Sequence, residues 1–353
     1  MTPPPTDERD FLLRNIWYFA LPGIRLKRGA MVAKTLLGEP LLFGRRDDGS
    51  VFALRDICPH RGIPLSYGAF DGREVECRYH GWRFDGDGRC TAIPSLCEGQ
   101  DLDVGRIRVK GRPCREVDGN LWVWFGDREP PPEGDERDVP RVPGIGAPGP
   151  RLVETMAFPC FVDHAVIGLM DPAHGPWVHK SWFWRSRRSI HEKAKAFGPV
   201  PYGFQMRRHS PSTNSRAYKL VGGRPSTEIT FRLPGVRIEH IAAGDHTLVN
   251  LTTVTPVSWT MSEVNHCVYW TMPWLSALKP VLRPYVRRFL GQDRDVVVQQ
   301  QEGLKHDPAL MLIRDADTQA RWYHQLKREW VRSEEEERPF RNPVKECVLR
   351  WRS

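Results

Sequence analysis

The sequence predicts two domains: a small all-β domain, then an α+β domain in which an antiparallel sheet grips a long helix. Three observations lead to this prediction. Short apolar stretches separated by turn signals fill the first 125 residues. Segment 128–150 is rich in proline, glycine and charge and cannot bury enough apolar surface to order itself. Longer strand patterns mixed with helical ones follow it. We therefore expect domains at 1–140 and 141–353.

The first domain is expected to be a small antiparallel β structure. The aromatic stretch 11–22 is expected to be an early helix or strand that pins the N-terminal part to the core. Segments 41–43 and 51–54 predict a hairpin, because the turn-forming sequence Asp47-Asp48-Gly49-Ser50 lies between them. Further strands are expected at 107–110 and 120–125.

The second domain combines strand and helix patterns. Together they indicate an antiparallel sheet packed against helices, which is an α+β arrangement. Strands are expected at 152–158, 226–231, 236–241, 247–254 and 266–270, and helices at 165–179, 282–304 and 316–331. Glu334 to Glu337 are expected to be a solvated charge run.

Two cysteine and histidine pairs lie in the first domain. Cys58 and His60 are two residues apart, Cys77 and His80 are three apart, and sixteen residues separate the pairs. Two loops that bring two thiolates and two imidazoles together suit a [2Fe-2S] cluster, with cysteine on one iron and histidine on the other.

Structural zinc is the competing assignment, because zinc also takes two cysteines and two histidines at similar spacings. The residues around the ligands favour the cluster. Gly62 and Gly81 follow the two pairs and would let backbone N–H groups approach bridging sulfides. Pro59 stiffens the first loop, and Trp82 can shield the second from solvent.

These residues resemble the Rieske domain of the Rieske non-heme iron oxygenases. The resemblance rests on Cys58-Pro59-His60-Arg61-Gly62 and Cys77-Arg78-Tyr79-His80-Gly81-Trp82, with the segments 49–54 and 93–94 on either side. It implies a Rieske cluster held by Cys58, His60, Cys77 and His80.

No electron-donating module is recognisable in the chain. The six other cysteines have no metal-ligand spacing and no ferredoxin-type run, and they are expected to be reduced thiols. No glycine-rich dinucleotide fingerprint follows a strand. The chain is therefore expected to carry no reductase of its own, and the resemblance implies that electrons from NAD(P)H arrive through a separate ferredoxin or flavin reductase.

The formal net charge of +9 bears on partners. The basic residues are dispersed and no binding motif accompanies them, so nucleic acid is not expected. An acidic electron carrier suits such a surface, and a functionally silent basic surface explains the charge equally well. The start lacks a signal-peptide pattern and no apolar run could span a bilayer, so a cytoplasmic protein is expected, with membrane contact left open.

A second candidate site lies at Asp171-Pro172-Ala173-His174-Gly175-Pro176-Trp177-Val178-His179. Two imidazoles and one carboxylate on one face are what a non-heme iron that activates O2 requires. On a regular helix His174 and His179 would point about 140° apart. Gly175 and Pro176 permit a distortion that could bring both rings to one ion. A helix capped by Asp171, with two ordinary histidines, is the alternative.

The segment resembles the D-x-x-H-x4-H motif of the same family. The resemblance implies that His174 and His179 bind iron, and that Asp171 bridges to a Rieske histidine of a neighbouring subunit. Asp171 lies three residues before His174 and could accept a hydrogen bond from its ring. The family pattern favours Asp293 as the third ligand, with Asp295 as the rival.

The resemblance implies the terminal oxygenase of a multicomponent system, arranged as a homotrimer. It would use O2 to hydroxylate or oxidatively demethylate a small organic substrate that is aromatic, sterol-like or otherwise apolar. The sequence around His174 is more similar to the monooxygenase and demethylase branch than to the ring cis-dihydroxylating dioxygenases. A different class, a Rieske electron-transfer or redox-sensing protein without a working iron site, remains the alternative.

Overall fold

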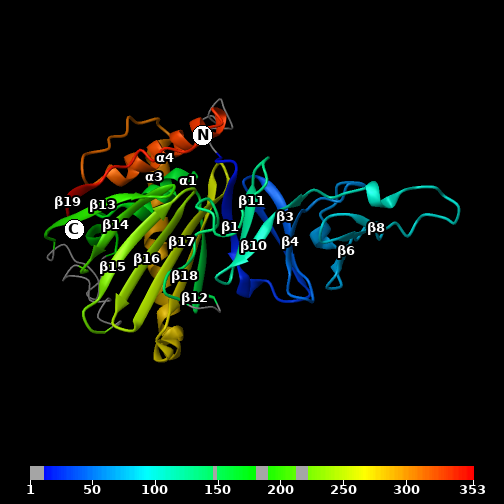
Figure 1. The fold of residues 1–353 in the computed structure, drawn as a ribbon, viewed down its shortest axis with the longest axis horizontal. Helices are drawn as coiled ribbons and strands as arrows, with labels where there is room; N and C mark the ends of the chain where they lie inside the picture. Colours follow the sequence, from blue (N-terminus) through cyan, green and yellow to red (C-terminus); the bar gives the residue numbers. More distant parts are fainter. Residues whose placement is uncertain (1–11, 146–148, 180–189, 212–221) are drawn as a thin grey trace. The chain divides into compact units, whose positions relative to one another are not determined.

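The computed structural model describes residues 12–145, 149–179, 190–211 and 222–353 (Figure 1). They form two compact units, one of Asn15–Pro130 and one of Pro131–Ser353 together with the residues before Asn15. The first unit is all-β and the second is α+β, so the predicted fold class is confirmed. The predicted domain boundary at 140 stays a prediction.

The first unit consists of three antiparallel sheets. Their orders are β1-β11-β10, β2-β3-β4-β9 and β5-β6-β7-β8. The strands are β1 (Ile16–Pro22), β2 (Ala30–Leu36), β3 (Glu39–Arg45), β4 (Val51–Arg55), β5 (Ala69–Phe70), β6 (Glu74–Glu76), β7 (Arg83–Asp85), β8 (Cys90–Ala92), β9 (Gly111–Arg112), β10 (Cys114–Val117) and β11 (Asn120–Phe125).

Aromatic pairs hold the first of these sheets together. β1 and β11 pair antiparallel and every residue of both strands is buried. Cross-strand partners place Trp17 on Trp124 and Phe19 on Trp122, with ring centroids 5.5 and 5.3 Å apart in edge-to-face geometry. Such pairs add stability beyond their buried area. The aromatic stretch at the start of the unit is therefore a strand.

The prediction of a strand at 107–110 is wrong. Val104–Arg106 form a 3-10 turn, and only an isolated bridge joins Arg108 to Arg89. The backbone N–H of Val109 instead donates to Gly88 O at 2.7 Å, in the turn before β8. The backbone of this segment therefore makes its hydrogen bonds to neighbouring turns and not to a continuous partner strand.

The second unit is built on an eight-stranded antiparallel sheet. Its order is β12-β18-β17-β16-β15-β14-β13-β19. The strands are β12 (Leu152–Phe158), β13 (Glu192–Val200), β14 (Gly203–His209), β15 (Ser226–Arg232), β16 (Val236–Ala243), β17 (His246–Ser258), β18 (Met261–Trp270) and β19 (Cys347–Arg352).

The described residues of this unit also form four α-helices: α1 (Val162–Met170), α2 (Gly175–Val178), α3 (Lys279–Leu304) and α4 (Thr318–Glu335). The long helix α3 packs on β12 and α1, and α1 also packs on α4 (Figure 1). No helix in the described part of the chain is both long and apolar enough to cross a bilayer.

Three strands of the second unit were not predicted. β13 and β14 carry many polar residues, and β19 belongs to the Arg- and Trp-rich tail. In β19, Leu349 and Trp351 are buried while Val348 is exposed, which is the alternation of a strand whose one face is covered. This strand pairs with β13 at the edge of the large sheet.

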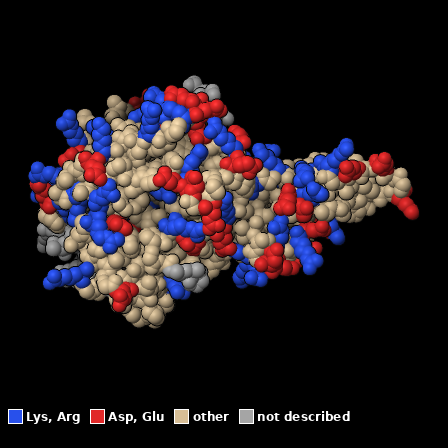
Figure 2. Space-filling model, viewed as in Figure 1, with Lys and Arg blue, Asp and Glu red and all other residues tan. Residues whose placement is uncertain are grey.

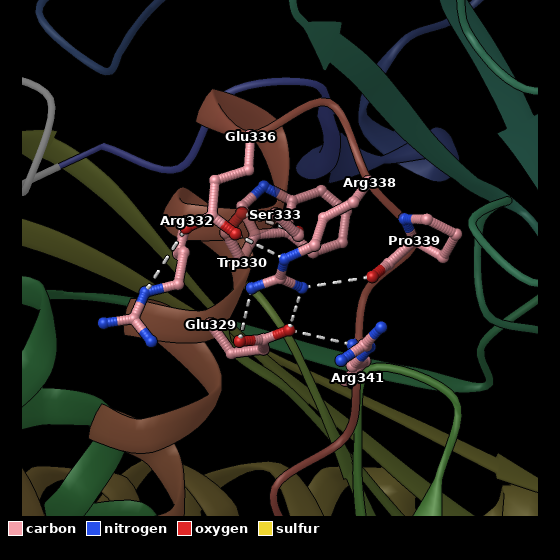
Figure 3. A network of polar contacts seen from close by, with 8 residues as sticks. All are labelled: Glu329, Trp330, Arg332, Ser333, Glu336, Arg338, Pro339 and Arg341. Carbon is pink, nitrogen blue, oxygen red and sulfur yellow. Dashed lines mark hydrogen bonds and ion pairs between the residues drawn. The ribbon is translucent and has the colours of Figure 1, made fainter.

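A polar network holds the chain where α4 ends (Figure 3). Arg338 donates two hydrogen bonds to the Glu329 carboxylate, at 2.6 and 3.1 Å, and these bonds lower the pKa of Glu329. The backbone N–H of Arg341 donates to the same carboxylate at 2.9 Å. The acidic run is also only partly solvated, because Glu334 pairs with Arg137 at 3.1 Å. The network directs the chain from α4 toward β19.

Candidate metal centres

The two cysteine and histidine loops of the first unit have the same backbone geometry. In the first loop, Cys58 N donates to Ile63 O at 2.9 Å and Gly62 N donates to Cys58 O at 2.9 Å. In the second, Cys77 N donates to Trp82 O at 2.8 Å and Gly81 N donates to Cys77 O at 2.9 Å. Each cysteine therefore begins a turn that closes at the fourth and fifth residues after it.

Both turns depend on glycine at the fourth position. Gly62 has φ +74° and Gly81 has φ +69°, the left-handed region that side chains with a Cβ rarely adopt. A Cβ on Gly81 would also approach Pro94 to 3.2 Å. The glycines that the sequence singled out are thus required by the shape of the loops.

The four predicted cluster residues form two close pairs, one of thiols and one of imidazoles. Cys58 and Cys77 are almost fully buried, and burial together with the neighbouring Cys77 thiol raises the pKa of Cys58 to about 11. The rings of His60 and His80 lie 4.6 Å apart, and Trp82 stacks on His60 at 4.5 Å. A pair of buried thiols and a pair of less buried imidazoles are the two kinds of ligand that a Rieske cluster needs.

One orphaned atom supports this fit. His80 Nδ1 is buried and has no hydrogen-bond partner among the described residues. An unsatisfied buried nitrogen is costly, and coordination to a metal would satisfy it. The residues present therefore fit a [2Fe-2S] cluster.

In the second unit, the helix predicted for 165–179 is broken. Its first part, α1, ends at Met170, and Asp171 has the extended backbone, φ −59° and ψ 120°, that a following proline imposes. The short helix α2 begins only after His174 and ends before His179. This break solves the problem of spacing, because the two histidines no longer have to point apart.

The break brings three ligand atoms together. His174 Nε2 and His179 Nε2 lie 3.0 Å apart, and Asp293 Oδ1 lies 3.5 and 3.1 Å from them. They form the metal-binding group found among the described residues. Ligands about 2.1 Å from one ion at right angles are about 3.0 Å apart. The three atoms therefore fit one face of an octahedral ion, the arrangement of non-heme Fe(II) oxygenases.

Burial keeps His174 ready to bind metal. His179 and Asp293 are buried, with 3% and 7% exposure, and desolvation lowers the pKa of His174 below its ordinary value of 6.5. A neutral imidazole has the free lone pair that a metal needs.

Two residues of α3 that the sequence reasoning missed position His179. Gln292 Oε1 lies 3.1 Å from His179 Nδ1, and the Phe289 ring stacks on the imidazole at 3.6 Å. A hydrogen bond from Nδ1–H to Gln292 leaves the lone pair on Nε2, the atom that faces His174 and Asp293. In the sequence, only the position of Gln292 directly before Asp293 could have pointed to this role.

Asp171 is near His174 but does not receive the expected hydrogen bond. Its Oδ2 lies 3.7 Å from His174 Nδ1, and that nitrogen is buried without a partner in the described chain. The other oxygen, Oδ1, accepts from Ala173 N at 2.7 Å. Burial raises the pKa of Asp171, while His174 opposes this shift.

Asp295 lies away from the histidines. Its side chain is 66% exposed and neighbours Arg294 at 3.8 Å, whereas Asp293 belongs to the buried stripe of α3 with Leu290 and Val297. The structure therefore brings Asp293, and not Asp295, to His174 and His179.

A cavity of about 330 Å³ adjoins the three residues. Its walls come from the large sheet and from α1 and α3, and most of the lining is apolar. A polar strip crosses the sheet wall, where Thr252 Oγ1 lies 2.8 Å from His266 Nδ1 and Asn250 donates to Glu239 at 3.4 Å. Burial lowers the pKa of His266 to about 4, so this ring is neutral near pH 7.

Sequence comparison supports the assignment of the first unit. A family model for the Rieske [2Fe-2S] domain matches residues 16–104. The chain is 37% identical over 177 residues to chlorophyllide a oxygenase of Chlamydomonas reinhardtii, which is 49% of this chain and 25% of that protein. It is 35% identical over 170 residues to the oxygenase component of dicamba O-demethylase from Stenotrophomonas maltophilia, 48% of each chain.

Solved structures agree with the fold of both units. Dicamba monooxygenase bound to dicamba superposes with a TM-score of 0.72 at 23% identity and covers 92% of this chain and 99% of that one. The first unit of the chain contains a Rieske [2Fe-2S] domain. A second solved structure, NdmA of Pseudomonas putida CBB5 with caffeine, superposes with a TM-score of 0.72 at 19% identity over 94% of each chain.

The sequence matches cover about half of this chain, whereas the structural superpositions cover nearly all of it. The chain spans between a quarter and about half of the length of the curated relatives above. The superposed structures extend over nearly the whole chain, at identities that speak for the fold.

Proposed function

We propose that the chain is the terminal oxygenase component of a multicomponent Rieske system. It uses O2 and electrons from NAD(P)H, delivered by a separate ferredoxin or flavin reductase, to hydroxylate or oxidatively demethylate an organic substrate. The observation that carries this proposal is the set of three ligand atoms on His174, His179 and Asp293 at the edge of a cavity.

The proposed cofactors have separate residues to hold them. Cys58, His60, Cys77 and His80 would hold the [2Fe-2S] cluster, and His174, His179 and Asp293 would hold a mononuclear Fe(II). The cluster stores an electron, and a mononuclear iron with open positions supplies O2 activation. Gln292 and Phe289 fix the orientation of His179, and the apolar cavity wall excludes water from the reacting face.

The cavity supports a largely apolar substrate with a few polar groups. Phe204, Phe231, Tyr285 and Phe289 are among its lining residues and suit a flat ring, and the strip with Asn250 and His266 can meet polar substituents. Relatives are named for chlorophyllide a, for dicamba and for a 4beta-methylsterol, which are in line with such a substrate.

We further propose a homotrimer and a cytoplasmic location. The support for the trimer is the placement of Asp171, which is half-buried beside His174 and could reach a Rieske histidine of a neighbouring subunit. Separate electron-transfer partners agree with the absence of a ferredoxin or dinucleotide motif from the sequence.

Ring dihydroxylation is the second candidate. A relative 35% identical over 133 residues is the oxygenase subunit of 3-chlorobenzoate-3,4-dioxygenase of Comamonas testosteroni. Product mass separates the two reactions, because a monooxygenase retains one oxygen atom of O2 in its products and a dihydroxylase retains two.

The variant His174→Ala tests the oxygenase proposal. We expect it to keep the visible absorption and EPR signal of the cluster and to lose O2-dependent turnover with a surrogate reductase. His306→Ala is the control, because His306 is exposed and lies outside the cavity. Substrate oxidation at the unaltered rate in His174→Ala would contradict the proposed iron site, whereas a protein that shows the cluster signal and no turnover even when unaltered would be an electron carrier.

A further inference from the structure

An apolar tip protrudes where the chain enters α3. It consists of the 3-10 helix η7 (Pro273–Leu278) and the first residues of α3, which form the gold segment at the lower edge of Figure 1. Trp274, Leu278 and Val281 are 49%, 40% and 72% exposed. Figure 2 shows this corner of the unit mostly in tan, with an acidic group at its margin.

The exposed apolar residues are not part of the core. The opposite side of the same segment already belongs to the core. Leu275 is buried in an apolar cluster of the large sheet, and Leu282 and Val286 pack against that cluster. Leu275, Leu282 and Val286 also line the cavity. The segment is therefore apolar on two sides. One side packs on the core, and the other is free to contact an apolar environment outside the protein.

Basic residues flank the tip. The first ten residues of α3 include four cations, Lys279, Arg283, Arg287 and Arg288. The sequence contains no Asp or Glu between Glu263 and Asp293. The side chains of Arg283 and Arg287 are 69% and 74% exposed, although both reach within 3.7 Å of the buried Glu154. The guanidinium groups are therefore still available to external anions.

We infer that this tip, which we call the α3 tip, docks on an anionic lipid surface. Tryptophan and aliphatic side chains beside lysine and arginine are the composition of segments that lie in a membrane interface. The segment would lie on the bilayer without spanning it. Two copies joined symmetrically through the α3 tip would bring the same four cations face to face, which disfavours a second copy as the occupant.

The docking inference goes beyond the proposed function and does not depend on turnover. If the proposed function also holds, docking places the cavity wall formed by Leu282 and Val286 at the lipid surface. A lipophilic substrate could then pass from the bilayer to the cavity without crossing water.

Vesicle sedimentation of the full-length protein tests the inference. We expect binding to vesicles of phosphatidylcholine with 30% phosphatidylglycerol, weaker binding at high salt, and little binding to phosphatidylcholine alone. The double variant Trp274→Ser/Val281→Ser should bind at least tenfold more weakly. Leu310→Ser/Met311→Ser is the matched control, because these side chains are 63% and 82% exposed but lie outside the α3 tip.

Three results would overturn the inference. One is no sedimentation with anionic vesicles, and another is equal binding by the two double variants. The third is an oligomer in solution that Trp274→Ser/Val281→Ser dissociates, which would make a second copy the occupant. Circular dichroism of each variant confirms that it is folded, and the readout needs no iron and no substrate.

Discussion

Gln292 provides the sharpest test of how α3 prepares the iron site. The proposed hydrogen bond from His179 Nδ1–H to Gln292 Oε1, at 3.1 Å, holds the ring so that Nε2 faces Asp293 Oδ1 at 3.1 Å. Gln292→Leu keeps a side chain of similar size and removes the acceptor. The imidazole can then change its tautomer or rotate.

The magnitude follows from comparable metal sites. Loss of an outer hydrogen-bond partner of a ligating histidine costs about 10- to 100-fold in metal affinity. This corresponds to about 1.4 to 2.7 kcal/mol. Burial of His179, at 3% exposure, keeps water from replacing the lost acceptor, so we expect a value near the upper end.

Competition with a chromophoric chelator measures Fe(II) affinity directly. Gln292→Glu retains an acceptor oxygen and should recover most of the affinity. Gln300→Leu, an exposed position on the same helix, should leave it unchanged. Fe(II) binding by Gln292→Leu as tight as that of the unaltered protein would refute the positioning role.

Three other predictions follow from the geometry. Asp293→Asn should reduce bound mononuclear iron at least tenfold by metal analysis, and Asp295→Asn should not, since only Asp293 faces the histidines; the reverse pattern would exchange their roles. Gly81→Ala should lower the free energy of unfolding by at least about 1 kcal/mol in urea, because its φ of +69° penalises a Cβ; an unchanged midpoint would contradict this. His266 has a pKa of about 4 in the folded state, below its ordinary 6.5. The unfolded state therefore binds the proton first, and this contribution to stability is complete above pH 6.5 and decreases by about 3 kcal/mol as the pH falls to 4. Urea unfolding across this range should show the decrease, and His266→Gln should remove that part of it; identical pH profiles would refute the assignment.

Local chemistry made the cluster loops predictable. Cysteine, histidine and glycine at short spacing define each loop almost completely, because every closing hydrogen bond falls within five residues. The strand β11 was equally readable, because burial on both faces leaves nearly continuous apolar sequence. The same continuity in the stretch that contains β1 left helix and strand open.

Local backbone chemistry decided some of the points that the sequence analysis left open, and tertiary contacts decided the others. Proline after Asp171 ended α1 and allowed His174 and His179 to converge, while the pattern had suggested one continuous helix. The choice between Asp293 and Asp295 could have been made from the apolar stripe of Leu290 and Val297, which Asp293 shares. Gln292 and the polar strip of the cavity became visible only in three dimensions.

The central claim is that one chain holds two different iron centres. Analysis of iron and acid-labile sulfide in the purified, anaerobically reconstituted protein tests it most directly. We predict about three irons and two sulfides per chain, from one two-iron cluster and one mononuclear ion. Two irons per chain, or zinc in place of iron at Cys58 and Cys77, would contradict the claim.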